Sequence, residues 1–232
     1  MEIWVQLAAG SGERMQTTTP KQFLRLGNRP LFLHSIETFL RAFPEGVVVC
    51  ALPLAHLSRG RKLLHQAFPE ATIHAIVGGP SRSASTEAVL HFLKENDFLD
   101  GESIVAFHDA ARPFVSESLI ERIFATAQAK GNAICGLPIA FSVREVEGEH
   151  SRALPRQRFW EVQTPQAFRS SLLLQAWQRL SPTANAAFTD EASWMEAAGI
   201  PIHLVPGEPS NLKITYPIDW ETARAWLRRR SR

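Results

Sequence analysis

The 232 residues suffice for one large domain with a buried core, and a composition of 45% hydrophobic and 21% charged residues excludes a disordered or fibrous protein. The formal net charge of +2 is too small to indicate nucleic-acid binding. No apolar run approaches the roughly 18 residues that span a membrane, and Met1 to Leu7 is too short for a signal peptide, so we expect a cytoplasmic protein without membrane contact.

Apolar, strand-like runs alternate with helical stretches along the first 140 residues. Strands are expected at Ile3 to Leu7, Gly46 to Leu52, Ala71 to Val77, Ser103 to Phe107 and Ala133 to Pro138. Helices are expected after Pro30, where apolar residues recur at three- and four-residue spacing, and over Ser83 to Lys94 and Ser116 to Ala129. This alternation predicts an α/β fold with a mainly parallel sheet flanked by helices.

The pattern changes between Ala140 and Phe159, where charged and alternating residues surround Gly148. It predicts a hairpin that projects from the domain and, with little apolar surface of its own, packs on something else. The remaining chain predicts helices at Ser170 to Arg179 and Thr189 to Ala198, a short strand at Ile202 to Val205 and a helix at Ile218 to Arg228. Since no repeat or linker interrupts it, residues 1–232 are expected to form a single domain.

A phosphate-binding loop is predicted where the first strand ends in LAAGSGERM, followed by Pro20 and Lys21. Small residues let backbone N–H groups approach an anion closely. The spacing is not that of a P-loop, and Met15 replaces the third glycine of the dinucleotide fingerprint. Arg14 and Lys21 add positive charges suited to a leaving pyrophosphate. The alternative is an ordinary glycine turn with surface cations.

A second motif, HDAARP, directly follows the expected strand that ends at Phe107. It places Asp109 at the carboxyl end of a strand, where open α/β sheets bind ligands. Its carboxylate suits a metal or ribose hydroxyls, and Arg112 suits a phosphate. The alternative is a salt bridge between Asp109 and Arg112 that tethers the loop. We interpret His108 as orienting the loop and not as a base.

Four weaker motifs follow: GGPSRSAS at 78–85, TPQAF at 164–168, TDEAS at 189–193 and NLKIT at 211–215. Turn glycines, helix caps and strand lysines would explain each of them in isolation. Lys213 is the most suggestive, because a lysine between apolar strand residues points away from the core, either to phosphates or to water.

In this order, these segments resemble the 2-C-methyl-D-erythritol 4-phosphate cytidylyltransferase family of the non-mevalonate isoprenoid pathway, over nearly the whole chain. The resemblance implies a Rossmann-like nucleotidyltransferase fold with a protruding β-arm at about 140–160 that clasps a second subunit in a homodimer. It implies transfer of CMP from CTP to 2-C-methyl-D-erythritol 4-phosphate, with release of pyrophosphate and with Mg²⁺ as cofactor.

The resemblance also implies residue roles, carried over by position in the matching motifs. The catalytic cations would be Arg14, Lys21 and Lys213. CTP would be bound by Ala8, Ala9, Gly10, Ser11, Gly12, Gly79, Ser85 and Asp109. The polyol phosphate would be bound by Asp109, Arg112, Ser142, Arg156, Thr164, Thr189 and Lys213, with Ser142 and Arg156 reaching the partner's site. Mg²⁺ would be held mainly by the triphosphate, with Asp109 as the candidate ligand.

The chain departs from the family pattern at four positions, Leu7, Pro80, Phe141 and Ser142, where many members carry proline, an acidic residue, aspartate and threonine. Two alternatives remain: a ribitol-5-phosphate cytidylyltransferase, which shares the loop and the CTP chemistry, and a non-catalytic nucleotide-binding protein on the same fold. TDEAS and HDAARP favour methylerythritol phosphate over ribitol phosphate, and the retained cations argue against lost activity.

Overall fold

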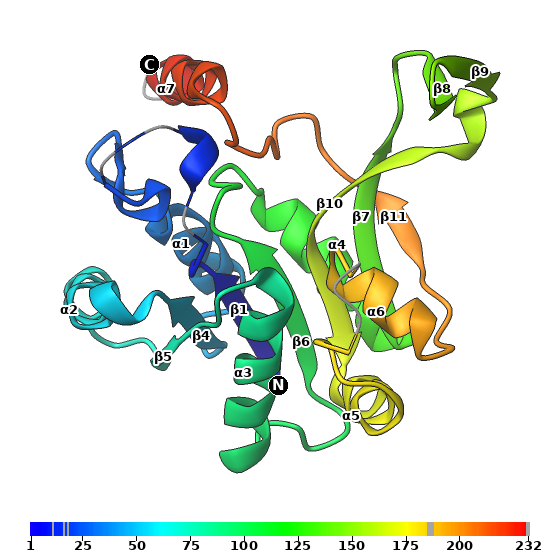
Figure 1. The fold of residues 1–232 in the computed structure, drawn as a ribbon. Helices are drawn as coiled ribbons and strands as arrows, with labels where there is room; N and C mark the ends of the chain where they lie inside the picture. Colours follow the sequence, from blue (N-terminus) through cyan, green and yellow to red (C-terminus); the bar gives the residue numbers. More distant parts are fainter. Residues whose placement is uncertain (11, 16, 18, 185–187, 231–232) are drawn as a thin grey trace.

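A computed structural model describes residues 1–10, 12–15, 17, 19–184 and 188–230 (Figure 1). Its centre is a seven-stranded sheet of order β11-β7-β10-β6-β1-β4-β5. The strands are β1 (Glu2–Leu7), β4 (Val47–Leu52), β5 (Ile73–Val77), β6 (Ile104–Asp109), β7 (Asn132–Pro138), β10 (Trp160–Arg169) and β11 (Leu204–Pro206). β1 pairs in parallel with β4 and β6, whereas β10 is antiparallel to both β6 and β7. The expected α/β class with a mainly parallel sheet is confirmed.

Helices cover both faces of this sheet (Figure 1). They are α1 (Leu33–Ala42), α2 (Leu57–Ala67), α3 (Arg82–Glu95), α4 (Glu117–Lys130), α5 (Ser170–Arg179), α6 (Glu191–Ala197) and α7 (Pro217–Arg230). Alternate strand residues face opposite sides: Trp4 joins the core beneath α1 and α4, while Ile3 and Val5 join the core beneath α3 and α5. The sheet is therefore buried on both faces, as the continuous apolar strands require.

Besides short pieces such as the paired strands β2 (Arg25–Leu26) and β3 (Arg29–Pro30), two longer elements were missing from the sequence expectation. β10 is a ten-residue strand inserted between β6 and β7, and it carries the TPQAF motif with a cis peptide bond between Thr164 and Pro165. A register shift between Gln163 and Gln166 accommodates that proline in the middle of a sheet. α2, with the sequence LSRGRKLLHQA, buries only Gly60 and Leu64, so its apolar stripe is too narrow to stand out.

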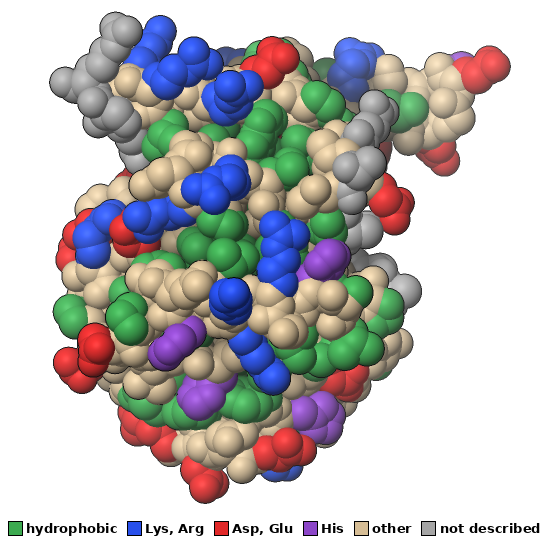
Figure 2. Space-filling view, turned by 90° about the vertical axis from the view of Figure 1, so that its left-hand side faces the viewer, with side chains coloured by type: hydrophobic (Ala, Val, Ile, Leu, Met, Phe, Trp, Pro, Cys, Tyr) green, Lys and Arg blue, Asp and Glu red, His purple; other side chains and the backbone are tan. Residues whose placement is uncertain are grey.

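The sheet edge at β5 is partly closed by α2. Arg61 donates from Nε and Nη2 to the carbonyl oxygen of Ala75, at 3.3 and 3.0 Å. Figure 2 shows this face, where Lys, Arg and His side chains alternate with apolar ones. A charged side chain over an edge strand disfavours pairing with another strand.

The predicted hairpin is present as a separate two-stranded sheet, β8 (Val143–Glu147) and β9 (His150–Leu154), joined at Gly148 with φ +59°. We call residues 140–159 the arm. It stands away from the body beyond the ends of β7 and β10 (Figure 1). Phe141 at its start is 83% exposed. Across the described part of the chain, no helix is long and apolar enough to cross a membrane.

Candidate active site

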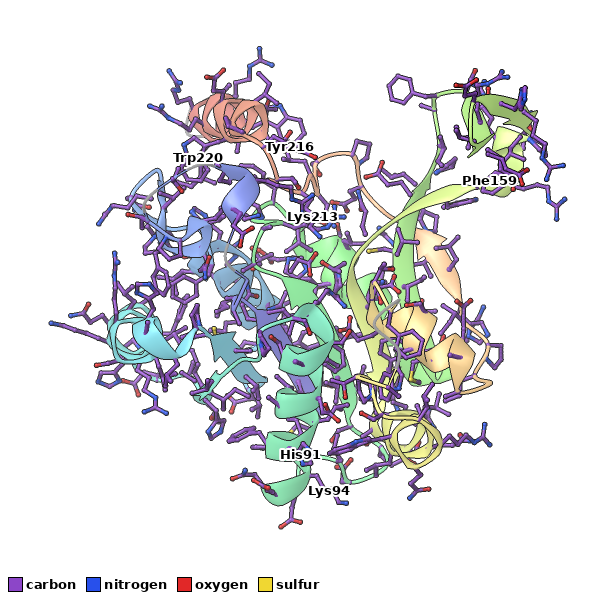
Figure 3. All side chains as sticks on the ribbon, viewed as in Figure 1. His91, Lys94, Phe159, Lys213, Tyr216 and Trp220 are labelled. Carbon is purple, nitrogen blue, oxygen red and sulfur yellow. The ribbon has the colours of Figure 1, made fainter. Side chains whose placement is uncertain are left out.

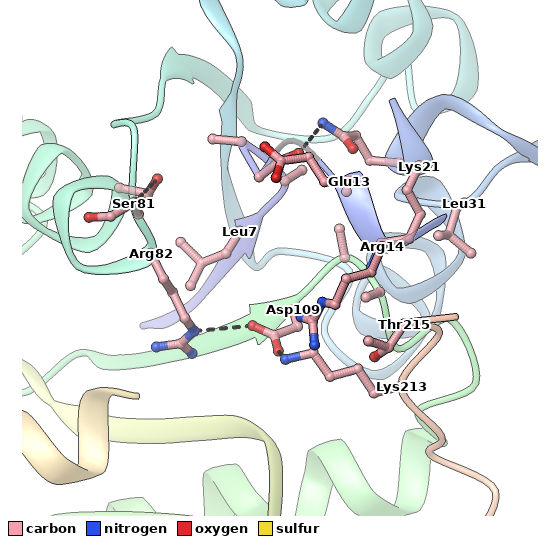
Figure 4. Close-up of a pocket in the computed structure, with 18 of the residues that line it drawn as sticks. Leu7, Glu13, Arg14, Lys21, Leu31, Ser81, Arg82, Asp109, Lys213 and Thr215 are labelled. Carbon is pink, nitrogen blue, oxygen red and sulfur yellow. Dashed lines mark hydrogen bonds and ion pairs between the residues drawn. The ribbon is translucent and has the colours of Figure 1, made fainter. Parts of the chain in front are cut away.

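The carboxyl ends of β1 and β6 border a cavity of about 560 Å³ (Figure 4). Because these strands run parallel, the segments that leave them emerge at one edge of the sheet, where open α/β sheets bind ligands. The described residues that form its wall are 7–10, 12–14, 21–22, 80–82 and 109–111, with Leu31, Ser85, Lys213 and Thr215. Segments from both halves of the sequence thus meet at one site.

The loop after β1 is held in place by close backbone packing. Ala8 donates its N–H to the carbonyl oxygen of Ala51 at 3.0 Å. Gly12 has φ +71°, and a Cβ built on it would lie only 3.0 Å from the Cβ of Lys21. Glycine is needed there for both the conformation and the close approach. The side-chain amide of Gln22 also donates to the carbonyl oxygen of Gly10 at 3.2 Å.

Lys21 reaches across the cavity wall to the C-terminal half of the chain. Its Nζ donates to the carbonyl oxygen of Ile214 at 2.7 Å. Burial, reinforced by the nearby charge of Lys213, lowers the pKa of Lys21 to about 8. The protein places too little negative charge near this ammonium group to offset its burial. The group is therefore suited to bind an anionic ligand, whose charge would raise the pKa of Lys21 again.

Asp109, the last residue of β6, lies between two cations. Its Oδ2 is 2.6 Å from Nζ of Lys213, and its Oδ1 is 3.3 Å from Nε of Arg82 (Figure 4). Burial alone would raise the pKa of Asp109, but the charges of Arg82 and Lys213 outweigh it and hold this pKa well below its usual range. The carboxylate is therefore ionised.

Arg82 and Glu191 join the site although sequence reasoning did not select either. Arg82 donates from Nη1 and Nη2 to the two carboxylate oxygens of Glu191, at 2.8 and 2.6 Å. Thr86 donates to the same carboxylate at 2.7 Å. Burial would lower the pKa of Arg82, but Glu191 and Asp109 raise it and keep the guanidinium charged. The sequence features that could have identified Arg82 and Glu191 are the arginine of GGPSRSAS and the glutamate of TDEAS.

Behind Asp109, a buried layer holds the HDAARP loop. Arg112 donates to the carbonyl oxygens of Asn211 and Val162, at 2.7 and 3.4 Å, so the proposed salt bridge from Arg112 to Asp109 is absent and that alternative is wrong. His108 Nε2 lies 2.9 Å from the Arg112 carbonyl oxygen, and burial lowers the pKa of His108 to about 4. Thr164 Oγ1 accepts from the Asp109 N–H at 3.1 Å.

Lys213 differs from the expectation in one respect: residues 211–215 form no strand. The segment is instead fixed by the Ile214 N–H, which donates to the carbonyl oxygen of Ala111 at 2.8 Å, and by burial of the Ile214 side chain. Lys213 and Tyr216 consequently lie between the body and α7 (Figure 3). The guanidinium of Arg14 lies 5.8 Å from the centroid of the Tyr216 ring.

The structure brings most of the predicted site residues together. Those that line the cavity are Ala8, Ala9, Gly10, Gly12, Arg14, Lys21, Ser85, Asp109 and Lys213. Others do not line it: Arg112 and Thr164 are buried behind it, Gly79 packs against Ala84, Thr189 is exposed just before α6, and Ser142 and Arg156 lie on the arm. The predicted Ser11 lies outside the described residues. Of the departures from the family pattern, Leu7 and Pro80 border the cavity.

The chain is similar to known proteins over nearly its whole length. Residues 3–229 match the family model described as IspD, 2-C-methyl-D-erythritol 4-phosphate cytidylyltransferase. A protein of that name from Syntrophus aciditrophicus (strain SB) is 34% identical, covering 96% of this chain and 94% of its own length. One from Azobacteroides pseudotrichonymphae genomovar. CFP2 is 36% identical, covering 95% and 96%.

Solved structures extend the likeness to the fold. The crystal structure of 2-C-methyl-D-erythritol 4-phosphate cytidylyltransferase from Thermus thermophilus superimposes with a TM-score of 0.68 at 33% identity, covering 97% of this chain and 98% of that one. Family model, relatives and fold all agree over nearly the full chain. The chain belongs to the 2-C-methyl-D-erythritol 4-phosphate cytidylyltransferase family.

Proposed function

We propose that the protein transfers CMP from CTP to 2-C-methyl-D-erythritol 4-phosphate, giving 4-diphosphocytidyl-2-C-methyl-D-erythritol and pyrophosphate. The observation that carries the proposal is the convergence of Arg14, Lys21 and Lys213 on a cavity walled by the loop after β1. Two polyanions must meet in this reaction, and fixed cations in a partly buried cavity are what lowers their repulsion. Membership in the family supports the choice of both substrates.

The reaction needs no general base, because the phosphate of the polyol is already an anion at neutral pH. One of its oxygens attacks the α-phosphorus of CTP, the new P–O bond forms, and the bond from the α-phosphorus to the bridging oxygen breaks. Both electrons of that bond leave with pyrophosphate. Positioning and charge stabilisation supply nearly all of the rate enhancement. Arg14, Lys21 and Lys213 stabilise the negative charge that develops on the transferred and leaving groups.

The loop is suited to hold CTP. Ala8, Ala9, Gly10 and Gly12 line the cavity, and residues this small leave space for a nucleotide. By family resemblance, the cytosine is assigned to the backbone near Ala8, Ala9 and Gly79, with Ser85 nearby. The triphosphate is assigned to the loop from Gly10 to Arg14. Ser85 is buried, and its hydroxyl donates to the carbonyl oxygen of Ser81 at 2.9 Å, so it shapes this wall.

Mg²⁺ is proposed as the cofactor. Carboxylates near the cavity are few, and nowhere in the described ranges do three or more His, Cys, Asp or Glu side chains form a metal-binding group. Both oxygens of Asp109 already have cationic partners. These residues fit a metal held mainly by triphosphate oxygens, with Asp109 as the candidate protein ligand. When bound, Mg²⁺ would neutralise phosphate charge.

The arm is proposed to complete the site of a second subunit in a homodimer. Ser142 and Arg156 are exposed and do not line their own chain's cavity, which supports a role outside it. Phe141 and Val146 are 83% and 71% exposed. Large apolar side chains exposed on a projecting hairpin favour a protein contact. The acceptor would then be held by Asp109, Thr189 and Lys213 of one chain and by the arm of the other, with Arg112 and Thr164 supporting the site from the buried layer behind Asp109.

The test is pyrophosphate release with CTP and Mg²⁺ and with each acceptor in turn. We expect release with 2-C-methyl-D-erythritol 4-phosphate and far slower release with ribitol 5-phosphate. Faster release with ribitol 5-phosphate would contradict the assigned acceptor. Absence of release with either acceptor, at CTP concentrations where binding is demonstrated, would indicate a non-catalytic nucleotide-binding protein.

A further inference from the structure

Glu191 is a charged residue that the proposed mechanism does not use. It begins α6, is only 2% exposed, and does not line the cavity. Its carboxylate accepts from both terminal nitrogens of Arg82 and from the hydroxyl of Thr86. Moving two charges out of water costs free energy, so apolar residues would fill this buried position at less cost than an ion pair. A contribution to folding stability therefore does not by itself explain why the pair is here.

The geometry of Arg82 connects Glu191 to the cavity. A guanidinium group is planar and presents its N–H groups in a rigid fork. Once Glu191 fixes Nη1 and Nη2, the direction of the Nε–H is fixed as well, and this nitrogen lies 3.3 Å from Oδ1 of Asp109. A lysine at position 82 would carry the same charge without this fixed direction.

The chain of contacts continues through Asp109 to Lys213. With Oδ1 directed at Arg82, Oδ2 faces Lys213, and their separation is 2.6 Å. Four charged side chains of alternating sign, from α6, α3, β6 and the segment after β11, therefore form one continuous series. Glu191 lies at its buried end and Lys213 lies in the cavity.

We propose that Glu191 and Arg82 are positioning residues that orient the carboxylate of Asp109, and through it the ammonium group of Lys213, for the acceptor phosphate. The inference rests on the proposed function, since it assigns a role within the same site. Neither residue touches substrate in this account: Glu191 fixes Arg82, and Arg82 fixes Asp109. The competing possibility is that the pair only joins α3 to α6.

A double-mutant cycle separates the two possibilities. Glu191→Gln removes the charge that fixes Arg82, and we expect kcat/KM for the acceptor to fall by about tenfold or more, within the range of coupling between contacting charges. On an Asp109→Asn background, the same substitution should cost less than about threefold, because the group that it orients is already altered. An equal loss on both backgrounds would overturn the proposal.

Two further variants complete the test. Arg82→Lys keeps the charge but not the fork, so it should lose activity like Glu191→Gln; wild-type activity in Arg82→Lys would contradict orientation. Glu208→Gln is the matched control, because Glu208 also accepts from a hydroxyl, Ser116, and lies 3.8 Å from an arginine, Arg122, but does not line the cavity. It should leave kcat/KM unchanged.

Folding is checked by thermal unfolding of each variant. If Glu191→Gln does not fold, the double variant Arg82→Gln/Glu191→Gln, which removes both charges of the pair, takes its place in the cycle. An equal loss of kcat/KM with and without Asp109→Asn would again overturn the proposal. Activity of the unaltered enzyme is measured first: its absence contradicts the proposed function, whereas an active enzyme with additive losses contradicts only the positioning role.

Discussion

The cavity wall and the arm contrast in how their charged side chains are held. In the wall, Arg82 contacts Glu191 across 109 positions of sequence, and Lys21 contacts Ile214 across 193. In the arm, Arg144 donates to Ser151 at 2.9 Å and Arg156 to the Ala140 carbonyl oxygen at 2.6 Å, all within the same hairpin. The body thus fixes the wall, whereas these charged side chains of the arm are held by the arm itself. That the arm serves a second subunit stays a prediction.

The largest expected effect lies in the wall. Lys21→Ala and Lys213→Ala should each lower kcat by about a hundredfold or more, the usual cost of removing one charge-assisted donor from a transition state. The unfolding temperature should change little by comparison, because both lysines lie at a cavity and not in the apolar core. Steady-state kinetics and calorimetry on purified variants measure both quantities. Near-normal turnover in either variant would remove that lysine from the assigned role.

The second prediction concerns the arm. Arg156→Ala should lower kcat/KM for the acceptor by about tenfold or more, as expected on loss of a charged phosphate contact, without changing CTP binding. If Arg156 serves the partner's site, mixing Arg156→Ala with Lys213→Ala should restore activity. Half of the dimers would be mixed, each with one intact site, giving about a quarter of wild-type activity. No recovery after subunit exchange would show that Arg156 acts within its own chain or not at all.

The third prediction uses the pKa of Lys21, which burial lowers to about 8. At subsaturating CTP, kcat/KM should fall as the pH rises through about 8, because the free enzyme loses this charge.

The same pKa predicts how stability depends on pH. Between about 8 and the ordinary pKa value of 10.5, the folded state binds fewer protons than the unfolded state, so the contribution of Lys21 to stability rises with pH over that window. Lys21→Met should abolish this rise in the unfolding temperature. An unchanged pH dependence in Lys21→Met would contradict the assignment.

The smallest effect is expected at Tyr216, which is 52% exposed and lies near Arg14. Its backbone is fixed by Asp219 Oδ2, which accepts from the N–H groups of Thr215 and Tyr216, both at 2.8 Å. An exposed cation–π contact is worth about 0.5–1 kcal/mol, so Tyr216→Ala should raise the KM for CTP by about two- to fivefold. Tyr216→Phe keeps the ring and should match the wild type. An equal effect of both variants would rule out the ring contact.

The contrast between wall and arm also explains what the sequence predicted. Strands such as Val47–Leu52, buried along their whole length, stand out as apolar runs, and the arm stands out by its charge and Gly148. β10 was missed because its first three residues, next to the arm, are exposed or only partly buried and because Pro165 interrupts the pattern. The polar residues of β10 are buried only because β6 and β7 flank it. That arrangement belongs to the tertiary structure and cannot be predicted from the local sequence.

For the site, local composition identified the loop after β1 and Asp109, since glycines and a charged residue at a strand end are local signals. Arg14 and Lys21 were placed near the leaving pyrophosphate by their position in and just after the loop, and the catalytic role of Lys213 came from family resemblance. All three roles stay predictions. Arg82 and Glu191 were missed because their partnership forms only when α3 and α6 meet. Arg112 was placed at a phosphate, yet its guanidinium is directed to the carbonyl oxygens of Asn211 and Val162.

The central claim is that the cavity at the ends of β1 and β6 joins CMP to a polyol phosphate. The most direct test is mass spectrometry of the purified protein's reaction with CTP, Mg²⁺ and 2-C-methyl-D-erythritol 4-phosphate. We expect 4-diphosphocytidyl-2-C-methyl-D-erythritol and an equimolar amount of pyrophosphate, and neither product in appreciable amount from Lys213→Ala over the same time. Unchanged CTP, or CTP hydrolysed without a diphosphate ester, would contradict the account.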